Sequence, residues 1–300
     1  MPIRAEDDLR ARGFRGEILT GAPLAPYTTW RIGGPADLLA TPSDRRDVDV
    51  ALAWAAARDV AWRVLGNGSN LLVRDEGVRG LVIRLRKVLD RIDFDDVSLT
   101  AGAGASFPAV GHFAADHGLA GLEFAAGIPG TIGGAVVMNA GWHEFETGRL
   151  VAAVDYLEAD GRASTYPQGR CRFGYRTSAF RGRKGVVLSA TFALVRDDPA
   201  IVRSRLDGFA AKRKETQPTE LPSCGSVFLK PEGDFAGRLI EAAGLKGRRI
   251  GGIEVSPKHA NFFVNVGGGT AKDVLALVER VEAEVLHASG VKLTREFEVW

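Results

Sequence analysis

The sequence has few cysteines, almost no net charge and no long apolar run. Its 300 residues include only Cys171 and Cys224, too few for a disulfide framework and without the spacing of a zinc site. This scarcity is typical of a protein that works in a reducing cytosol, so we expect a cytoplasmic location. The five histidines are scattered and form no metal-binding pattern, so no metal is expected.

The balance of charge and hydropathy excludes further classes of protein. Thirty-nine basic and 37 acidic residues leave a formal net charge of +2, which gives no strong field to attract nucleic acid or anionic lipid. The N-terminal stretch carries alternating charges where a secretory signal needs an apolar run, and nowhere do about eighteen uncharged apolar residues occur together. We therefore expect no nucleic-acid partner and no membrane insertion.

The chain instead has enough apolar material for more than one core. Hydrophobic residues make up 45% of the 300 positions, and this length suggests two or three domains. Periodicity predicts a mixture of helices and strands, with strands dominating the middle of the chain. The predicted helices are residues 48–59, 109–117, 201–214, 234–244 and one that begins at Thr270. The predicted strands are residues 62–65, 71–73, 81–85, 151–157, 186–195 and 291–300. The first three are expected to lie in one sheet, and a polar stretch follows at 93–98.

Two of these helices carry signals at their ends. Asp234 is the expected N-cap of one helix, and Gly244 is its expected stop. In the last helix, Thr270 and Asp273 have the spacing of a capping box. The apolar residues that follow share one face, which we expect to belong to the core: Val274, Leu277, Val278, Val281 and Val285.

Two glycine-rich stretches are candidates for binding phosphate groups. Residues 66–70 lie between two predicted strands, where backbone N–H groups can converge on a phosphate, although a tight turn also explains this motif. Residues 127–141 are harder to explain by packing alone, because ordering so many glycines is entropically costly. Their spacing is not GxGxxG, so we predict a dinucleotide cofactor held by a fold other than the Rossmann fold.

A few polar side chains could carry chemistry. Arg176 follows Tyr175, and its guanidinium can form two hydrogen bonds with a carboxylate or a developing enolate, while a surface ion pair is the simpler interpretation. Ser226 follows a glycine and is either a proton donor or a turn serine, since no GxSxG elbow indicates a hydrolase. Taken alone, Glu296 is compatible with a solvated charge, and His259 with either a ligand or a core histidine.

Five separated motifs occur in one order along the chain. They are residues 29–36, residues 65–72, residues 127–141, Tyr175-Arg176 with Ser178 and Phe180, and residues 225–228 followed by 237–265. In this order the chain resembles the UDP-N-acetylenolpyruvoylglucosamine reductase family from Thr29 to Glu296. Because no tyrosine follows Tyr175, it resembles the branch of that family without a substrate-covering tyrosine loop.

The resemblance implies an α+β fold with a vanillyl-alcohol-oxidase-like (PCMH-type) FAD-binding domain of two subdomains and a C-terminal α+β substrate-binding domain. The implied boundaries are residues 1–85, which residues 291–300 could complete, residues 86–199 and residues 200–290. The positions implied to bind FAD are Arg31, Ile32, Gly33, Gly34, Gly66, Asn67, Gly68, Ser69, Asn70, Gly127, Thr131, Gly133, Gly134 and Asn139.

The resemblance also implies a reaction. NADPH, as co-substrate, gives a hydride to FAD, which passes it to the enolpyruvyl methylene carbon of UDP-N-acetylglucosamine enolpyruvate. The product is UDP-N-acetylmuramate, a peptidoglycan precursor. Ser226 would protonate the adjacent carbon, and Arg176 and Glu296 would hold the substrate carboxylate and stabilise the enolate-like charge. The implied substrate-binding residues are Tyr175, Arg213, Lys214, Lys230 and His259.

Two other functions remain open from the sequence. One is a flavin oxidase of the same fold that acts on another alcohol or sugar, which would leave Arg176, Ser226 and Glu296 without a common task. The other is a non-enzymatic module that binds nucleotide sugars. The colour of the purified protein and its response to NADPH distinguish the three.

Overall fold

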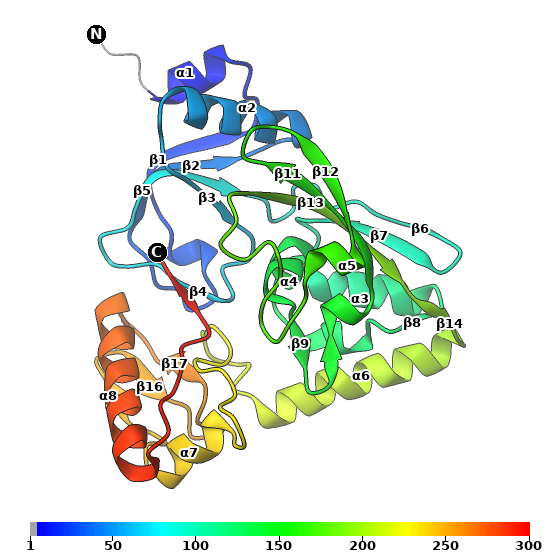
Figure 1. The fold of residues 1–300 in the computed structure, drawn as a ribbon. Coiled ribbons are helices and arrows are strands. Elements are labelled where there is room, and N and C mark those ends of the chain that lie inside the picture. The colour runs from blue at the N-terminus through cyan, green and yellow to red at the C-terminus, as the bar shows by residue number, and fades with distance from the viewer. Residues whose placement is uncertain (1–4) are drawn as a thin grey trace. The chain divides into compact units, whose positions relative to one another are not determined.

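The computed structural model describes residues 5–300, which form two compact units (Figure 1). Unit 1 comprises the chain up to Thr20, Leu38–Asn67 and Gly80–Lys212; unit 2 comprises Gly21–Asp37, Gly68–Arg79 and Arg213–Trp300. The chain therefore passes from one unit to the other at several points. One of these points divides the glycine-rich motif of residues 66–70 between the two units.

The first sheet has the strand order β1-β2-β5-β3. Its elements and those beside it are α1 (Ala5–Ala11), β1 (Glu17–Pro23), β2 (Pro35–Thr41), α2 (Arg45–Ala57), β3 (Trp62–Leu65) and β5 (Val78–Arg84). Helix α2 buries Val48, Ala51, Leu52 and Ala55, one face at helical spacing, in a core with residues of β5. The predicted helix 48–59 and the predicted strands 62–65 and 81–85 are thus confirmed to within a few residues.

A buried carboxylate joins α2 to the segment before β1. Asp47 is fully buried, and it accepts hydrogen bonds from the backbone N–H groups of Arg15 (3.1 Å), Gly16 (2.8 Å) and Ser43 (2.8 Å). Burial alone would raise the pKa of this carboxyl, but the hydrogen bonds outweigh it and the net pKa is lowered. The ionised form therefore contributes stability above the unfolded-state pKa of about 3.9, and this contribution is lost as pH falls through the lower folded-state pKa.

We expect Asp47→Asn to lower the free energy of unfolding by about 1–3 kcal/mol at pH 7, because an amide N–H₂ group then faces backbone donors. The matched control is Asp49→Asn, an exposed carboxylate on the same helix that pairs with Arg45. Urea unfolding at a series of pH values measures both variants. The deficit of Asp47→Asn should shrink below about pH 4, and a constant deficit down to the acid limit of the fold would contradict this account.

The second sheet of unit 1 is antiparallel and has the order β12-β11-β13-β7-β6. Its strands are β6 (Ile92–Asp95), β7 (Ser98–Gly102), β11 (Val151–Glu158), β12 (Ala163–Pro167) and β13 (Gly185–Ala193). The polar stretch at 93–98, to which no strand was assigned from the sequence, lies in a hairpin in which Asp95 pairs with Ser98. Strand β6 is difficult to predict from the sequence because it is mostly exposed and half of its residues are aspartates.

Helices and short strands surround this second sheet. They are α3 (Phe107–Asp116), β8 (Leu119–Ala120), η2 (Glu123–Gly127), α4 (Ile132–Met138), β9 (Gly141–Trp142), β10 (Phe145–Glu146), η3 (Thr147–Arg149), α5 (Gln168–Cys171), β14 (Val195–Arg196) and α6 (Pro199–Thr216). Helix α4 packs against β7 and β13, so its N-terminal glycines lie close to the sheet (Figure 1). The predicted helices 109–117 and 201–214 correspond to α3 and α6.

Unit 2 is built around a three-stranded sheet with the order β15-β16-β17. Its elements are η1 (Ala25–Tyr27), β4 (Leu71–Leu72), α7 (Ala236–Ala242), β15 (Arg249–Ile250), β16 (Ile253–Val255), β17 (Phe263–Asn265), α8 (Ala271–Ser289) and β18 (Glu298–Val299). Helix α8 begins after a capping box made by Thr270 and Asp273, and all five apolar residues predicted for its core face are buried. It packs against β15 and β16.

Three local predictions in unit 2 were wrong. The N-cap of α7 is Phe235, because the Asp234 carboxylate bonds the N–H of Phe235 itself and pairs with Arg238. Leu71-Leu72 does not continue the sheet of β3 and β5 but pairs in parallel with β18. The strand predicted over 291–300 is reduced to β18, together with an isolated bridge between Arg295 and Phe228.

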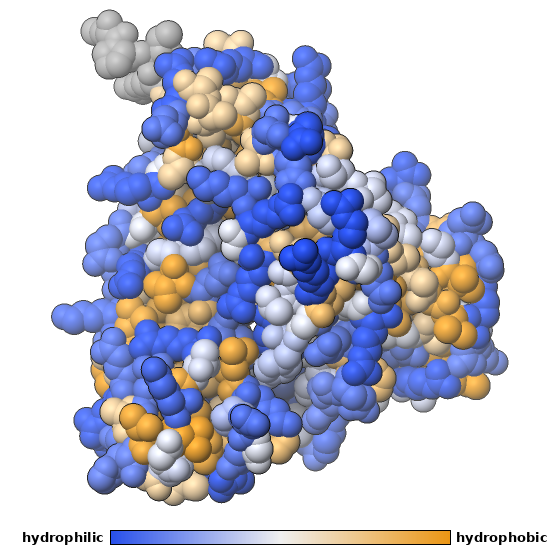
Figure 2. Space-filling model, in the orientation of Figure 1, coloured by the Kyte–Doolittle hydropathy of each residue, from blue (hydrophilic) through white to orange (hydrophobic). Residues whose placement is uncertain are grey.

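The exposed sides of these elements are mainly polar. Hydrophilic side chains cover most of the face drawn in Figure 2, with small apolar patches between them, as expected when apolar residues fill internal cores. No helix within residues 5–300 combines the length and apolar character needed to cross a lipid bilayer.

Candidate functional site

Two of the segments predicted to bind FAD meet in unit 1. Gly66 follows β3 directly, and a Cβ at this position would lie 2.6 Å from Oγ1 of Thr131. Thr131 is the N-cap of α4, and its Oγ1 accepts a hydrogen bond from the N–H of Gly134 (3.4 Å). A Cβ at Gly134 would have no neighbour closer than 3.7 Å, so this side of the helix start is open to a ligand.

The rest of the α4 N-terminus is fixed by its own chain. The N–H groups of Ile132 and Gly133 donate to the carbonyls of Ala105 and Ala103, both at 2.9 Å. A Cβ at Gly133 would lie 3.2 Å from Cβ of Ala103. Close packing on residues 103–105 therefore accounts for part of the glycine content that the sequence linked to a ligand alone. The contribution of Gly127 and Gly133 to cofactor binding remains a prediction.

Residues 68–70 and the segment that leads into residues 31–34, also predicted to bind FAD, meet in unit 2. Gly68 has a left-handed backbone (φ +62°), and its missing Cβ would lie 2.5 Å from the carbonyl oxygen of Tyr27. The N–H of Thr29 donates to the carbonyl of Gly68 (3.1 Å), which brings residues 68–70 beside the segment that leads into Arg31. A Cβ at Gly34 would lie 2.1 Å from the carbonyl oxygen of Asp75. Each unit thus places two glycine-containing segments against each other.

Two of the three predicted catalytic residues lie on neighbouring segments of unit 2. Residues 226–228 form isolated bridges with Phe262 on one side and with Arg295 on the other. The N–H of Glu296 donates to the carbonyl of Val227 (2.8 Å), which fixes the backbone of Glu296 beside that of Ser226. The side-chain amide of Asn70, from a segment predicted to bind FAD, donates to the carbonyl of Glu296 (3.3 Å). The predicted cofactor and catalytic segments therefore converge here.

Cys224 lies two residues before Ser226 and is buried. Burial raises the pKa of the Cys224 thiol well above its usual value, and the negative charge of Glu296 raises it further. The thiol therefore stays protonated at neutral pH, and it cannot act as the nucleophile or base of this site.

The third predicted catalytic residue, Arg176, lies in unit 1 on a two-residue turn. Gly174 and Thr177 exchange backbone hydrogen bonds (3.0 and 3.1 Å) across Tyr175-Arg176. The Arg176 guanidinium donates from Nη2 to the carbonyl of Gly141 (3.0 Å) and lies 5.2 Å from the centre of the Tyr175 ring. Half of Tyr175 is exposed, so this aromatic and the guanidinium are presented together at the surface of unit 1.

Asn139 connects α4 to this turn. It is 1% exposed and adopts the left-handed conformation that ends α4. Its Oδ1 accepts from the N–H of Gly148 (2.7 Å), while its Nδ2 donates to the carbonyl of Gly174 (2.9 Å) and to Glu146 (3.1 Å). The side chain predicted to contact FAD thus uses its hydrogen bonds within the protein, a structural role that sequence reasoning missed.

At the end of α6, Arg213 and Gln217 each have a buried polar atom that makes no hydrogen bond within residues 5–300. Burial lowers the pKa of the Arg213 guanidinium to about 10. Within residues 5–300, neither Nε of Arg213 nor Oε1 of Gln217 has a hydrogen-bond partner, although both atoms are buried. Gln217 is 8% exposed, and its N–H donates to the carbonyl of Arg213, which places the two residues on one helical face. Such atoms are typical of a site completed by a ligand; the sequence analysis did not single out Gln217.

The remaining substrate-binding candidates have mostly structural contacts. Lys230 is exposed and lies over the ring of Phe235 (4.4 Å). The carbonyl of Lys214 accepts from the ammonium of Lys258 (2.6 Å). Burial lowers the pKa of His259, whose Nδ1 accepts from the N–H of Asn261 (3.2 Å), so this imidazole is neutral near pH 7.

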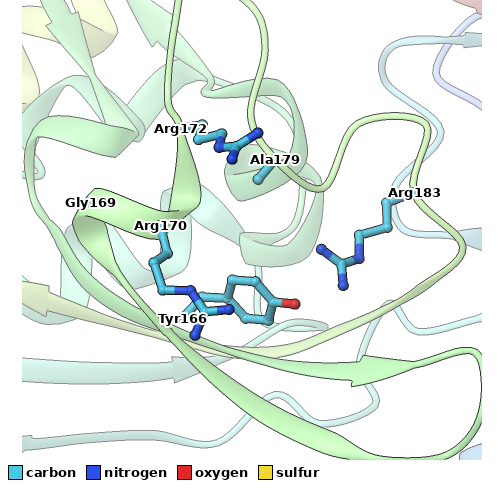
Figure 3. Close-up of a pocket in the computed structure, with 6 residues that line it drawn as sticks. All are labelled: Tyr166, Gly169, Arg170, Arg172, Ala179 and Arg183. Atoms are coloured by element: carbon cyan, nitrogen blue, oxygen red, sulfur yellow. The ribbon is translucent and has the colours of Figure 1, made fainter.

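A surface pocket of unit 1 has none of the predicted site residues in its lining. It measures about 310 Å³ and is lined by Tyr166, Gly169, Arg170, Arg172, Ala179 and Arg183 (Figure 3). The guanidinium groups of Arg170 and Arg183 lie 5.0 and 5.3 Å from the centre of the Tyr166 ring. Glu158 accepts from the Tyr166 hydroxyl (2.6 Å) and from Arg183 (2.9 Å). Cation–π contacts and an ion pair explain this cluster without a ligand.

Comparison with known proteins identifies the family. Residues 36–165 match the model of the FAD binding domain, and residues 217–300 match that of the UDP-N-acetylenolpyruvoylglucosamine reductase C-terminal domain. The reductase of Moorella thermoacetica is 46% identical over 288 residues, which cover 96% of this chain and 95% of that protein. The reductase of Rubrobacter xylanophilus is 49% identical over 278 residues, covering 92% and 93%. The chain belongs to the UDP-N-acetylenolpyruvoylglucosamine reductase family.

Solved structures agree with membership of the reductase family. The crystal structure of the reductase (MurB) from Thermus caldophilus superposes with a TM-score of 0.82 at 39% identity, over 96% of this chain and 99% of that one. A berberine bridge enzyme variant superposes with a TM-score of 0.51 at 12% identity, over 65% of this chain and 44% of that one, and shows the fold alone. The family resemblance and the FAD-binding fold class predicted from the sequence are therefore confirmed.

Proposed function

We propose that this protein is a cytoplasmic, FAD-dependent reductase that uses NADPH to convert UDP-N-acetylglucosamine enolpyruvate into UDP-N-acetylmuramate for peptidoglycan precursor synthesis. The observation that supports it most directly is the convergence in unit 2, where Asn70 bonds the backbone of Glu296 and Glu296 lies beside the strand of Ser226. In this proposal residues 1–199 hold the cofactor, and residues 200–290 hold the substrate.

The glycine segments fit the cofactor. The open helix start at Gly134 and the close approach of Gly66 to Thr131 suit one part of a dinucleotide, and residues 31–34 with 68–70 suit another. Bound FAD would supply hydride transfer from NADPH to the substrate, a step that no side chain can perform.

The side chains would then handle charge and protons. Hydride addition to the methylene carbon of the enolpyruvyl group pushes negative charge toward its carboxylate, where the Arg176 guanidinium would stabilise it. Glu296 belongs to the same proposed set, and a carboxyl group can donate a hydrogen bond to that charge only while protonated. The Ser226 hydroxyl would deliver a proton to the adjacent carbon. Arg213, whose buried Nε has no hydrogen-bond partner among residues 5–300, would hold the UDP diphosphate beside Gln217.

We expect Arg213→Ala to raise the KM for the sugar nucleotide by about 10–100-fold and to change kcat little, because a charge-assisted hydrogen bond contributes about 1.5–3 kcal/mol. The matched control is Arg205→Ala, which removes an exposed guanidinium from α6 that pairs with Asp197. Steady-state kinetics at saturating NADPH measures both variants. An unchanged KM in Arg213→Ala would remove this residue from the diphosphate site.

One experiment tests the proposed function as a whole. The purified protein should show flavin absorbance, which anaerobic NADPH should bleach and UDP-N-acetylglucosamine enolpyruvate should restore. Restoration by oxygen alone would favour an oxidase of the same fold. A colourless protein that still binds UDP-sugars would favour a binding module.

A further inference from the structure

The backbone of Arg176 is held in a conformation that few side-chain-bearing residues adopt. Its φ is +54°, in the left-handed region, where the Cβ of an L-residue crowds the following carbonyl. The turn that carries it contains only Tyr175 and Arg176 between the paired Gly174 and Thr177. Such strain persists only where the surrounding structure holds it in place.

Three side chains hold this turn. Asn139 donates from Nδ2 to the carbonyl of Gly174 (2.9 Å) on one arm, and Ser178 donates from Oγ to the carbonyl of Val137 (2.8 Å) on the other. Both bonds tie the turn to the end of α4. The third bond is different, because Arg181 donates from Nη1 to the carbonyl of Arg176 itself (2.9 Å). It fixes the peptide plane that leaves the strained residue, and its donor is charged.

The far end of Arg176 is fixed as well. Its Nη2 donates to the carbonyl of Gly141 in β9 (3.0 Å). Gly141 pairs with Glu146, and a Cβ at Gly141 would lie 2.2 Å from the carbonyl oxygen of Phe145. This carbonyl accepts from one of the five N–H groups of the Arg176 guanidinium. Two hydrogen bonds thus fix Arg176. One runs from its Nη2 to the carbonyl of Gly141, and the other runs from Arg181 to its backbone carbonyl.

We propose that Arg181 is a positioning residue for Arg176. It touches no reacting atom; it acts by keeping the 174–177 turn in the left-handed form that presents the Arg176 guanidinium. This inference rests on the proposed function, in which Arg176 receives the substrate carboxylate. It adds a second arginine of the same loop to the machinery of sugar reduction.

The first test separates the two half-reactions in Arg181→Met. Reduction of the enolpyruvyl sugar nucleotide should slow by about 10–100-fold, as for loss of an oriented transition-state donor, while reduction of the flavin by NADPH stays within about twofold. Arg181→Lys, which retains one charged donor, should recover most of the rate. The control is Arg172→Met, an exposed arginine of the same loop, which should behave as wild type.

A double-mutant cycle tests whether Arg181 acts through Arg176. In an Arg176→Ala background, Arg181→Met should slow sugar reduction no further. Independent, multiplicative losses in the double variant would overturn the proposal, as would equal losses in both half-reactions of Arg181→Met.

A crystal structure of Arg181→Met gives a readout that does not depend on the reaction. We expect Arg176 to leave the left-handed region and to lose its bond to Gly141; retention of both would refute the positioning role. Failure of the wild-type protein to reduce the sugar nucleotide would refute the proposed function instead, so the two failures are distinguishable.

Discussion

Ser226→Ala should slow reduction of the enolpyruvyl sugar nucleotide by about 10²–10⁴-fold, while reduction of the flavin by NADPH stays within about twofold. The proton is needed only after hydride has reached the sugar nucleotide, so its loss affects one half-reaction. The backbone around the residue is fixed by the bridge to Phe262 and by the bond from Glu296 to Val227, so loss of one hydroxyl should leave the strand in place. Stopped-flow absorbance, recorded separately for flavin reduction and reoxidation, measures the two rates.

The control for this experiment is Ser223→Ala. It removes a hydroxyl from the same segment, on the other side of the buried Cys224. It should leave both rates within about twofold of wild type, since surface changes away from special features are usually small. If Ser226→Ala lowers both rates equally, or neither, Ser226 is not the proton donor.

Much of the fold could be predicted from local pattern. The apolar stripe of α8 is core because its residues recur at helical spacing, and the Thr270 capping box marks its start. The β6–β7 hairpin was missed because β6 is only four residues long and mostly exposed, so its apolar–polar alternation is a weak signal. The partner of Leu71-Leu72 was also wrong, since β4 pairs with β18, more than two hundred residues away, and no local signal encodes that pairing.

The two units alternate along the chain, which also limits how well the domain boundaries can be predicted from the sequence. Residues 66–67 belong to unit 1, and residues 68–70 to unit 2, although they form one motif in the sequence. Segments of each unit are separated by segments of the other, so composition along the chain cannot show which of them fold together. The domains predicted from the sequence were contiguous apart from residues 291–300, whereas the compact units alternate at several points along the chain.

For the site, residue types were easier to predict than their contacts. Glycine at positions 34, 68 and 133 indicated backbone approach to a ligand, but each also allows a neighbouring segment to pass closely. Asn139 looked like a cofactor contact, yet its side chain bonds three groups of the protein. Only the fold shows that Arg213 and Gln217 each bury an atom that has no hydrogen-bond partner in the described part of the chain. These properties depend on distances between segments remote in sequence.

Gly68→Ala should cost about 2–5 kcal/mol of unfolding free energy and weaken FAD binding by about tenfold or more. A left-handed backbone with a Cβ costs about 1–2 kcal/mol, and forcing atoms into a packed region adds about 1–3 kcal/mol. The new Cβ would lie 2.5 Å from the carbonyl oxygen of Tyr27 and 2.8 Å from Cα of Thr28, and neither backbone atom can rotate away. A displacement of residues 68–70 that weakens the cofactor contacts by about 1.4 kcal/mol corresponds to a tenfold loss of affinity for FAD.

Gly21 is a matched control for this prediction because it isolates the clash from the backbone strain. Its φ is +63°, against +62° for Gly68, it also lies in unit 2, and a Cβ built on it meets nothing within 4 Å. Gly21→Ala should therefore cost only about 1–2 kcal/mol and leave FAD binding unchanged. Urea unfolding and flavin titration of the apoprotein compare the two variants. Equal effects would show that Gly68 is required for its left-handed backbone alone, whereas a larger loss of FAD affinity in Gly68→Ala would place the contact between residues 68 and 27–28 beneath the cofactor.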